Sequence, residues 1–339
     1  MQHIKTKISL LVLSVIFFTN CKTNSKTDPR NTFPDSSKYE LVKDWPQLSE
    51  GYVLSQPTGI GIDTSENIFV FHRTGRIWTD TFPDSLISSN TILMLDRETG
   101  KIINSWGANL FIMPHGLTVD KYNNVWVTDV GLHQVFKFTH DGKLLMKLGV
   151  AKVPGNDSLH FNLPTDVAVK SDGSFYVSDG YGNSRVVKFS AASHYLFEWG
   201  KKGIKPGEFN IPHGIDLDEK GNVYVADREN NRIQVFDSTG KYLNGWEDSS
   251  FKRVFSVNIE KKSQQLFAID YMSITPLIVN GSDILKFDDS LKLINRFGRT
   301  GGCNTSSDWY HDIAIDNEGN IYVGDITNKK VQKFKRVAR

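Results

Sequence analysis

Short runs in which apolar and polar residues alternate recur along the chain, separated by turns rich in Asp, Gly and Asn. Four segments share one order of runs, at residues 113–138, 163–189, 211–236 and 309–334. In each, an alternating run and a turn precede a β-branched and aromatic run that ends in Asp, and a polar loop and a further alternating run follow. Alternation with a period of two, interrupted by Asp-Gly, Gly-Asn or Asn-Asn, predicts strands joined as hairpins.

The aspartates that end the second run set the period of the repeat. They are Asp129, Asp179, Asp227 and Asp325, at intervals of 50, 48 and 98 residues. Because the last interval is about twice the others, a degenerate copy is expected between them, with its second strand at 266–270 and its third at 284–287. An earlier copy lies at 58–72 and continues at 91–95. Six repeats of roughly 40–55 residues, each with several strands, predict the blades of a propeller.

The expected fold is therefore all-β, a six-bladed β-propeller that occupies residues 46–339. A hydrophobic fraction of 39% and 27 glycines suit a protein with many strands and turns. No helical periodicity of useful length occurs, and no apolar run after residue 20 is long enough to span a membrane as a helix. A length of 339 residues is compatible with a propeller built as a single unit.

Three histidines occupy the same position in alternate repeats. His213 lies 98 residues after His115, and His311 lies 98 residues after His213. Alternate blades of a six-bladed ring are related by a three-fold rotation, and the first strand of a blade lines the central channel, so the three rings should face one axis. Three neutral imidazoles can hold Zn²⁺ with an open fourth position, although three unrelated polar residues in a wet channel would give the same spacing. Iron or cobalt could also occupy such a site.

The N-terminus has the pattern of a targeting segment. Lys5 and Lys7 precede an apolar run at 8–18, which indicates a signal peptide at 1–20. Cys21 follows directly and is the expected lipidation site, as in bacterial lipoproteins, although Asn20 and Phe18 depart from the usual residues before such a cysteine. Residues 21–45 are then a lipidated N-terminus and a polar tether. Ordinary secretion or an uncleaved anchor is the alternative.

Charge and cysteine content exclude some classes of function. The formal net charge is +2, and it falls to zero without the two lysines of 1–20. A nucleic-acid surface needs a basic face, so no nucleic-acid partner is expected. If Cys21 is acylated, Cys303 remains as a free thiol, and it is less favoured as a fourth metal ligand than as a structural residue.

Several motifs are more specific than a generic propeller repeat. They are Phe-His-Arg-Thr-Gly-Arg-Ile-Trp at 71–78, Met-Pro-His-Gly-Leu-Thr-Val-Asp at 113–120, Trp-Val-Thr-Asp-Val-Gly-Leu-His-Gln-Val-Phe-Lys at 126–137, Pro-Thr-Asp-Val-Ala-Val at 164–169, Val-Ser-Asp-Gly-Tyr-Gly-Asn-Ser-Arg at 177–185, Val-Ala-Asp-Arg-Glu-Asn-Asn-Arg-Ile-Gln at 225–234 and His-Asp-Ile at 311–313. With them, residues 50–336 resemble the NHL-repeat propellers and, more closely, the peptidyl-α-hydroxyglycine α-amidating lyases. The resemblance implies a zinc-dependent lyase that cleaves peptidyl-α-hydroxyglycine to a peptide amide and glyoxylate.

The resemblance also assigns residues to roles. It implies zinc ligands at His115, His213 and His311, and a structural Ca²⁺ bound by the main-chain carbonyls of Ile60 and Leu117 and the carboxylate of Asp312. It implies catalytic roles for Tyr181, Arg73 and Arg228. Taken from the sequence alone, Tyr181 is a loop aromatic, Arg73 a charge at a strand end, and Arg228 is equally compatible with an ion pair to Asp227 or Glu229.

The chain departs from the family pattern at several positions. Disulfide positions of the animal enzymes are occupied by Asn162, Gly182, Tyr224 and Val235. Near the third histidine, Trp309 replaces a methionine and Tyr310 replaces a proline, so the site and its substrate are expected to differ. No monooxygenase domain occurs within this sequence.

The expected substrate is a peptide or small molecule that ends in an α-hydroxyglycine. Metal would acidify its hydroxyl, Tyr181 would transfer the proton, and Arg73 would bind the carboxylate, with Arg228 a weaker candidate for that task. Two alternatives remain: a metal-dependent ester or lactone hydrolase, and a non-enzymatic surface NHL protein. We further expect a monomer, held by a lipid anchor at the membrane of a bacterial cell envelope on its periplasmic or outer side, or otherwise secreted.

Overall fold

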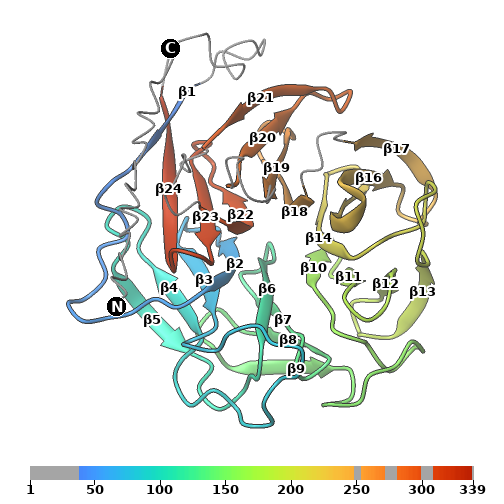
Figure 1. The fold of residues 1–339 in the computed structure, drawn as a ribbon, viewed down its shortest axis with the longest axis horizontal. Helices are drawn as coiled ribbons and strands as arrows, with labels where there is room; N and C mark the ends of the chain where they lie inside the picture. Colours follow the sequence, from blue (N-terminus) through green and yellow to red (C-terminus); the bar gives the residue numbers. More distant parts are fainter. Residues whose placement is uncertain (1–37, 248–252, 272–280, 299–307, 338–339) are drawn as a thin grey trace, which may run out of the picture.

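A computed structural model describes residues 38–247, 253–271, 281–298 and 308–337. The targeting segment, Cys21 and Cys303 lie outside the described residues. Within them, the chain forms six four-stranded antiparallel sheets arranged as blades around a central axis (Figure 1). The expected six-bladed β-propeller is confirmed.

Each blade runs from an inner strand at the axis to an outer strand. Blade 1 contains β2 (Pro57–Ile62), β3 (Ile68–His72), β4 (Ile92–Leu95) and β5 (Ile102–Trp106), and blade 2 contains β6 (Pro114–Val119), β7 (Val125–Asp129), β8 (Gln134–Phe138) and β9 (Leu144–Leu148). Blade 3 contains β10 (Asp166–Val169), β11 (Phe175–Asp179), β12 (Arg185–Phe189) and β13 (Tyr195–Trp199), and blade 4 contains β14 (Pro212–Leu217), β15 (Val223–Asp227), β16 (Arg232–Phe236) and β17 (Tyr242–Glu247). Blade 5 contains β18 (Arg253–Ile259), β19 (Leu266–Tyr271), β20 (Ile284–Phe287) and β21 (Leu293–Phe297).

Blade 6 closes the ring with strands from both ends of the described chain. It combines β22 (Tyr310–Ile315), β23 (Ile321–Asp325) and β24 (Lys330–Val337) with β1 (Lys38–Leu41) as its outer strand. The register pairs Lys38 with Val337 and Leu41 with Phe334. The expected boundary at residue 46 therefore leaves out a strand of the propeller, because β1 belongs to no repeat and its four residues carry no repeat signal.

Burial decreases from the middle strands of a blade to its outer strand. All five residues of the middle strand β7 are buried, because neighbouring blades cover both of its faces, whereas the outer strand β9 is largely exposed. Aromatic residues fill the spaces between blades. Trp126 of blade 2, for example, packs on Phe175 of blade 3 with ring centroids 4.7 Å apart. Apolar burial between blades is the main stabilising contribution.

The degenerate copy expected from the doubled interval is blade 5. The segments predicted as its second and third strands, 266–270 and 284–287, correspond to β19 and β20. The single short helix of the described residues is η2 (Arg228–Asn230), one 3₁₀ turn. None of the described helices combines the length and apolarity needed to cross a bilayer.

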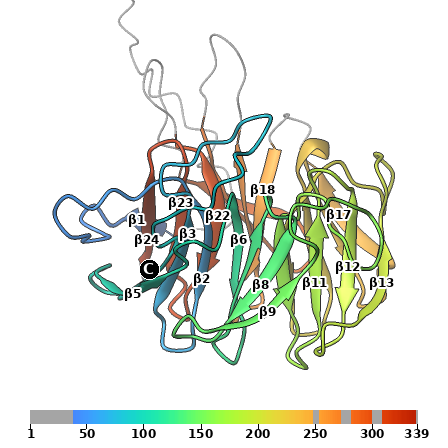
Figure 2. The ribbon, with the colours of Figure 1, turned by 90° about the horizontal axis from the view of Figure 1, so that it is seen from below.

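The six inner strands place their first residues at one face of the ring, where the loops after the second strands also lie (Figure 2). Each recurring Asp at the end of a second strand is fully buried and ties these two sets of loops together. Asp129 accepts hydrogen bonds from the main-chain N–H groups of Ile112 and Met113 before the inner strand, and from that of Leu132 after the second strand, each at 2.8 Å. The recurring aspartate thus fixes the geometry of the face that carries the candidate site.

Candidate metal centre and active site

Three histidine rings from alternate blades meet on the channel axis. His115 lies on β6, His213 on β14 and His311 on β22. The ring centroid of His115 lies 4.7 Å from each of the other two, which are 4.9 Å apart. One ring nitrogen from each lies within 4.8 Å of the others, and all three residues are buried. The structure thus brings together the three imidazoles at one point, as the 98-residue spacing predicts.

Each ring is oriented by a carbonyl of the next blade. The Nδ1 atoms of His115, His213 and His311 lie 2.7, 2.7 and 2.8 Å from the main-chain oxygens of Thr165, Phe255 and Thr58. Because a carbonyl oxygen accepts, each Nδ1 must carry the proton and donate it. The Nε2 atoms then hold free lone pairs, the arrangement that second-shell partners impose on metal-binding histidines.

The surroundings keep these imidazoles neutral. Burial lowers the pKa of His311 to about 3, and it lowers the pKa values of His115 and His213 well below their usual range. The nearby guanidinium groups of Arg73 and Arg228 act in the same direction. Neutral imidazoles with convergent lone pairs are a suitable donor set for Zn²⁺ or a related cation. The buried triad could therefore hold a metal.

The phenol of Tyr181 lies at the histidine cluster. Its oxygen is 3.2 Å from Nε2 of His115 and 3.0 Å from Nε2 of His213. Tyr181 stands in the loop after β11, where its main-chain N–H bonds to the carbonyl of Leu163. The hydroxyl can donate its proton to only one of the two imidazoles at a time. Because the oxygen lies this close to both Nε2 atoms, the phenol can exchange a proton with a group bound at the triad.

Arg228 contacts the phenol directly. Its Nη1 donates to the Tyr181 oxygen at 3.0 Å, and its Nε donates to Glu229 at 3.0 Å. The guanidinium also lies over the rings of Tyr181 and Phe255, about 5 Å from each centroid. The sequence left open whether Arg228 is catalytic or forms an ion pair. The structure shows an ion pair with Glu229 and a hydrogen bond to Tyr181.

Arg73 is buried at the start of the loop after β3. Its Nε donates to the carbonyl of Pro114, and its Nη1 donates to Gln56. Burial lowers the pKa of Arg73 to about 10, which still leaves it charged at neutral pH. A buried cation beside the triad provides a fixed positive charge for an anionic ligand.

The positions assigned to calcium lie on three adjacent inner strands, β2, β6 and β22. The Asp312 carboxylate accepts from the main-chain N–H of Ile60 and from the hydroxyl of Ser256, both at 2.7 Å. Burial raises the pKa of Asp312 to about 7, and burial with the charge of Asp312 raises that of Asp166. Both carboxylates line the same cavity as the three histidines, and a hard cation would relieve their mutual repulsion.

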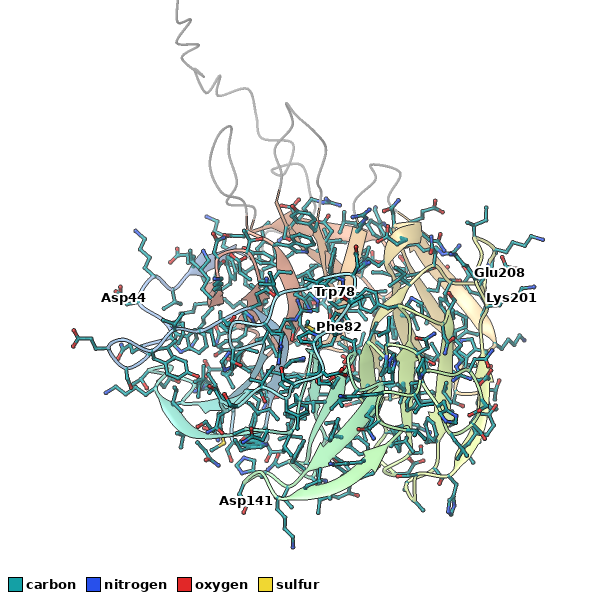
Figure 3. All side chains as sticks on the ribbon, turned by 60° about the horizontal axis from the view of Figure 1, so that its bottom comes forward. Asp44, Trp78, Phe82, Asp141, Lys201 and Glu208 are labelled. Carbon is teal, nitrogen blue, oxygen red and sulfur yellow. The ribbon has the colours of Figure 1, made fainter. Side chains whose placement is uncertain are left out.

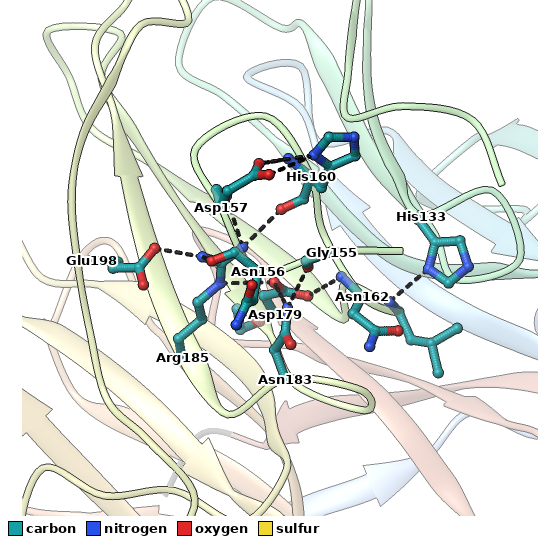
Figure 4. A network of polar contacts seen from close by, with 12 residues as sticks. His133, Gly155, Asn156, Asp157, His160, Asn162, Asp179, Asn183, Arg185 and Glu198 are labelled. Carbon is teal, nitrogen blue, oxygen red and sulfur yellow. Dashed lines mark hydrogen bonds and ion pairs between the residues drawn. The ribbon is translucent and has the colours of Figure 1, made fainter. Parts of the chain in front are cut away.

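A polar network surrounds the loop that carries Tyr181 (Figure 4). Gly182 donates to the main-chain oxygen of Asn162 at 3.0 Å, so these family disulfide positions are neighbours here without a bridge. Tyr224 and Val235 are likewise paired across β15 and β16. Asp179 joins Arg185 at 3.0 Å and accepts from the N–H of Asn162 at 2.9 Å. Buried hydrogen bonds thus hold the loop that carries Tyr181.

The replacements near the third histidine build an aromatic wall. Trp309 stacks on Tyr271, with ring centroids 4.2 Å apart, and packs edge-on against Phe255. Phe255 in turn contacts the ring of His213 at 5.0 Å. Tyr310 is buried and donates to the carbonyl of Gly298. The sequence identified the replacements but carried no signal for the stacking partner, which comes from another blade.

The motif at 71–78 ends in Trp78, which has no role in the sequence pattern and lies on the loop between β3 and β4. Its ring centroid is 4.7 Å from that of Tyr181 and 5.4 Å from the Arg73 guanidinium. Figure 3 shows Trp78 and Phe82 close together on the propeller, and the centroids of their aromatic rings are 5.0 Å apart. The usable signal was the length of the loop at 73–91, since the equivalent loop of blade 2 spans only 130–133.

Sequence comparisons agree with this architecture. The model of the NHL repeat matches residues 111–138, 161–189 and 209–236, which contain the first three strands of blades 2, 3 and 4. NHL repeat-containing protein 3 of Mus musculus is 31% identical over 318 residues, which cover 87% of this chain and 84% of that protein. Peptidyl-alpha-hydroxyglycine alpha-amidating lyase 1 of Drosophila melanogaster is 33% identical over 355 residues, which cover 90% of this chain and 63% of that protein.

The chain belongs to the peptidyl-α-hydroxyglycine α-amidating lyase family of NHL-repeat propellers. Peptidyl-glycine alpha-amidating monooxygenase B of Xenopus laevis is also similar, at 37% identity over 319 residues and 86% of this chain. The chain spans only 35% of the length of that protein. A solved structure of streptogramin B lyase shares the fold, with a TM-score of 0.56 at 15% identity, over 89% of this chain and 98% of the other.

Proposed function

We propose that this chain is a metal-dependent lyase that cleaves the C–N bond of peptidyl-α-hydroxyglycine and releases a peptide amide and glyoxylate. The observation that carries the proposal is the position of the Tyr181 oxygen, within 3.2 Å of two imidazoles whose free nitrogens face one point. Membership of a family with lyases of this name supports the substrate class.

Zinc is the metal that we propose for the triad, with His115, His213 and His311 as its ligands. Three buried, neutral imidazoles with Nδ1 tied to carbonyls fit it, because the Nε2 lone pairs converge and, among the described residues, no carboxylate joins the set. Bound there, Zn²⁺ would supply Lewis acidity and lower the pKa of a hydroxyl at its open position.

The two arginines bind the substrate carboxylate in this proposal. Arg73 is buried and charged beside the triad, and a guanidinium matches a carboxylate through two parallel hydrogen bonds. Arg228 approaches from blade 4 and already donates to Tyr181. Fixing the carboxylate orients the carbinol carbon so that its hydroxyl faces the histidines and its amide nitrogen faces away.

Tyr181 moves the proton. Its phenolate form accepts the proton of the substrate hydroxyl and becomes the neutral phenol, the C–O bond becomes the aldehyde of glyoxylate, and the electron pair of the C–N bond leaves with the amide nitrogen. The nitrogen then takes a proton, which the same phenol can return. Atoms balance without water, so the reaction is an elimination and not a hydrolysis.

The deciding experiment is glyoxylate release from α-hydroxyhippurate by a fragment that lacks residues 1–21. We expect release that is lost on chelation and returns on addition of zinc. If the folded, zinc-loaded protein released no glyoxylate, the reaction proposal would be wrong. Release of a carboxylic acid from an ester or lactone would instead support a hydrolase, and absence of any transition metal from the purified protein would favour a binding propeller like other NHL proteins.

The remaining assignments are proposals of the same kind. We propose that Asp312, with the carbonyls of Ile60 and Leu117, holds a structural Ca²⁺ at the same cavity as the triad, where a cation would stabilise the buried carboxylates. We also propose that Cys21 is acylated and anchors a monomeric propeller to the cell-envelope membrane. Mass spectrometry of the N-terminal peptide for a diacylglyceryl cysteine tests the anchor.

A further inference from the structure

The loop between β3 and β4 is longer than its counterparts in blades 2, 3, 4 and 6. It covers residues 73–91, whereas the equivalent loops of blades 2, 4 and 6 cover only 130–133, 228–231 and 326–329. The extra length carries the chain from blade 1 toward blade 3, because Trp78 reaches the ring of Tyr181. We call residues 73–91 the strap.

Both ends of the strap are fixed. The N–H of Gly75 donates to Ser55 at 2.8 Å, and Ile87 exchanges main-chain hydrogen bonds with Phe111 and Asn109. Phe82 packs against the apolar core of blades 1 and 2. Trp78 is therefore held at a defined place on the face of the ring.

The indole of Trp78 is not a core residue. It remains 39% exposed, although it contacts Tyr181, Phe82 and Arg73 at 4.7, 5.0 and 5.4 Å. An exposed tryptophan costs hydrophobic free energy. Its position beside a candidate proton donor and a candidate carboxylate ligand gives it a free apolar face at the site.

Backbone strain at the root of the strap is a second observation. Thr74 has a φ of 41°, a region that β-branched residues avoid, and Gly75 follows with a φ of 90°. Such strain costs on the order of 1–3 kcal/mol and persists where the surrounding structure imposes it, most often at functional sites. Here it turns the chain immediately after Arg73 and sends Trp78 over the site.

We propose that Trp78 determines substrate specificity by packing against an aromatic or large aliphatic group on the acyl side of the cleaved bond. This inference rests on the proposed function. With the carboxylate on Arg73 and Arg228 and the hydroxyl toward the histidines, the acyl group must leave the site along its rim. The exposed face of Trp78 lies on that rim next to Tyr181 and can stack on a planar group.

The test compares two substrates that differ in the acyl group, α-hydroxyhippurate with a benzoyl group and N-acetyl-α-hydroxyglycine with an acetyl group. For Trp78→Ala we expect the ratio of kcat/KM values, benzoyl over acetyl, to fall roughly 10-fold, mainly through KM. Trp78→Phe should restore most of the ratio. Leu86→Ala, an exposed residue of the same strap, is the matched control and should keep the wild-type ratio.

Two outcomes would overturn the inference. A ratio unchanged in Trp78→Ala would show that the indole does not contact the acyl group. An equal loss of kcat for both substrates would show that Trp78 only positions Tyr181. If the wild type released glyoxylate from neither substrate, the proposed function would fail, and calorimetric binding of hippurate against N-acetylglycine to wild type and Trp78→Ala would still test the subsite.

Discussion

At each of the three histidines, one main-chain carbonyl decides which ring nitrogen carries the proton. The carbonyls belong to Thr165, Phe255 and Thr58, each on the blade that follows its histidine. The inter-blade hydrogen bonds therefore do two tasks at once, because they join neighbouring inner strands and orient the lone pairs toward the axis. Side-chain chemistry at this site depends on the spacing of the blades.

Replacing Tyr181 with Phe removes the oxygen that faces both His115 and His213 while keeping the ring contact with Trp78. We expect kcat for glyoxylate release to fall on the order of 100-fold or more, the usual contribution of a positioned proton-transfer group. Metal content measured by emission spectroscopy should stay at the wild-type level. Near-wild-type turnover would assign proton transfer to another group.

The depressed pKa values of the triad predict how stability of the metal-free protein depends on pH. Unfolded histidines titrate near pH 6.5, whereas folded His311 titrates near 3 and His115 and His213 lie well below their usual value. As the pH falls below 6.5, the three histidines bind protons in the unfolded chain but stay neutral in the folded chain. Stability that is complete above pH 6.5 is thus lost progressively toward pH 3.

Urea denaturation of the chelated protein between about pH 7 and pH 5.5 measures this loss. Three groups give an upper limit of roughly 4 kcal/mol per pH unit. A variant with Gln at His115, His213 and His311 is the control and should show a smaller slope, because other groups then account for the remainder. Identical slopes in both proteins would contradict the assignment of neutral, buried imidazoles.

At the scale of one element, the aspartate after the second strand governs the face of each blade. Burial raises the pKa of Asp129 to about 6, while hydrogen bonds from Leu132, Met113 and Ile112 oppose that rise. In Asp129→Ala these three main-chain N–H groups lose their acceptor. We expect the free energy of unfolding to fall by roughly 3 kcal/mol, since each unsatisfied buried donor costs about 1–3 kcal/mol and water relieves part of it.

Asp141→Ala provides the comparison for this variant. Asp141 lies in the exposed turn between β8 and β9, where its partner is Thr139, and its loss should change stability by less than about 0.5 kcal/mol. Chemical denaturation of the two variants decides the matter. Equal stabilities of the two variants would mean that the recurring aspartate does not stabilise the fold through its hydrogen bonds.

The elements differ in how far the sequence determines them. Equal spacing identified the three histidines, and a doubled interval identified blade 5, because repeats carry their own phase. The strap has no counterpart of its length in blades 2, 3, 4 and 6, so no comparison with those repeats singles out Trp78 within its motif. The stack of Trp309 on Tyr271 pairs residues from different blades, and only the closed ring brings them together.

The whole molecule depends on closure of the ring, which β1 provides. β1 pairs with β24 over Lys38–Leu41, and Tyr39 stacks on Phe297 of blade 5 at 4.4 Å. Without β1, β24 would become an exposed edge strand, and blade 6 would lose a contact with blade 5. His311 belongs to blade 6 and His213 to blade 4. A weaker contact between blades 5 and 6 should therefore displace the His311 imidazole relative to that of His213 and disturb the triad.

Two fragments that differ only in β1 test this coupling between closure and the site. Compared with a fragment that starts at residue 38, one that starts at residue 42 should melt about 2–3 °C lower, as a loss of one to two kcal/mol implies for a chain of this size. It should also bind zinc more weakly, because an imidazole displaced from the axis no longer contributes its lone pair. Differential scanning calorimetry and zinc titration measure the two effects. Lower melting with unchanged zinc affinity would separate stability of the ring from geometry of the triad, and equal melting temperatures would assign closure to contacts other than β1.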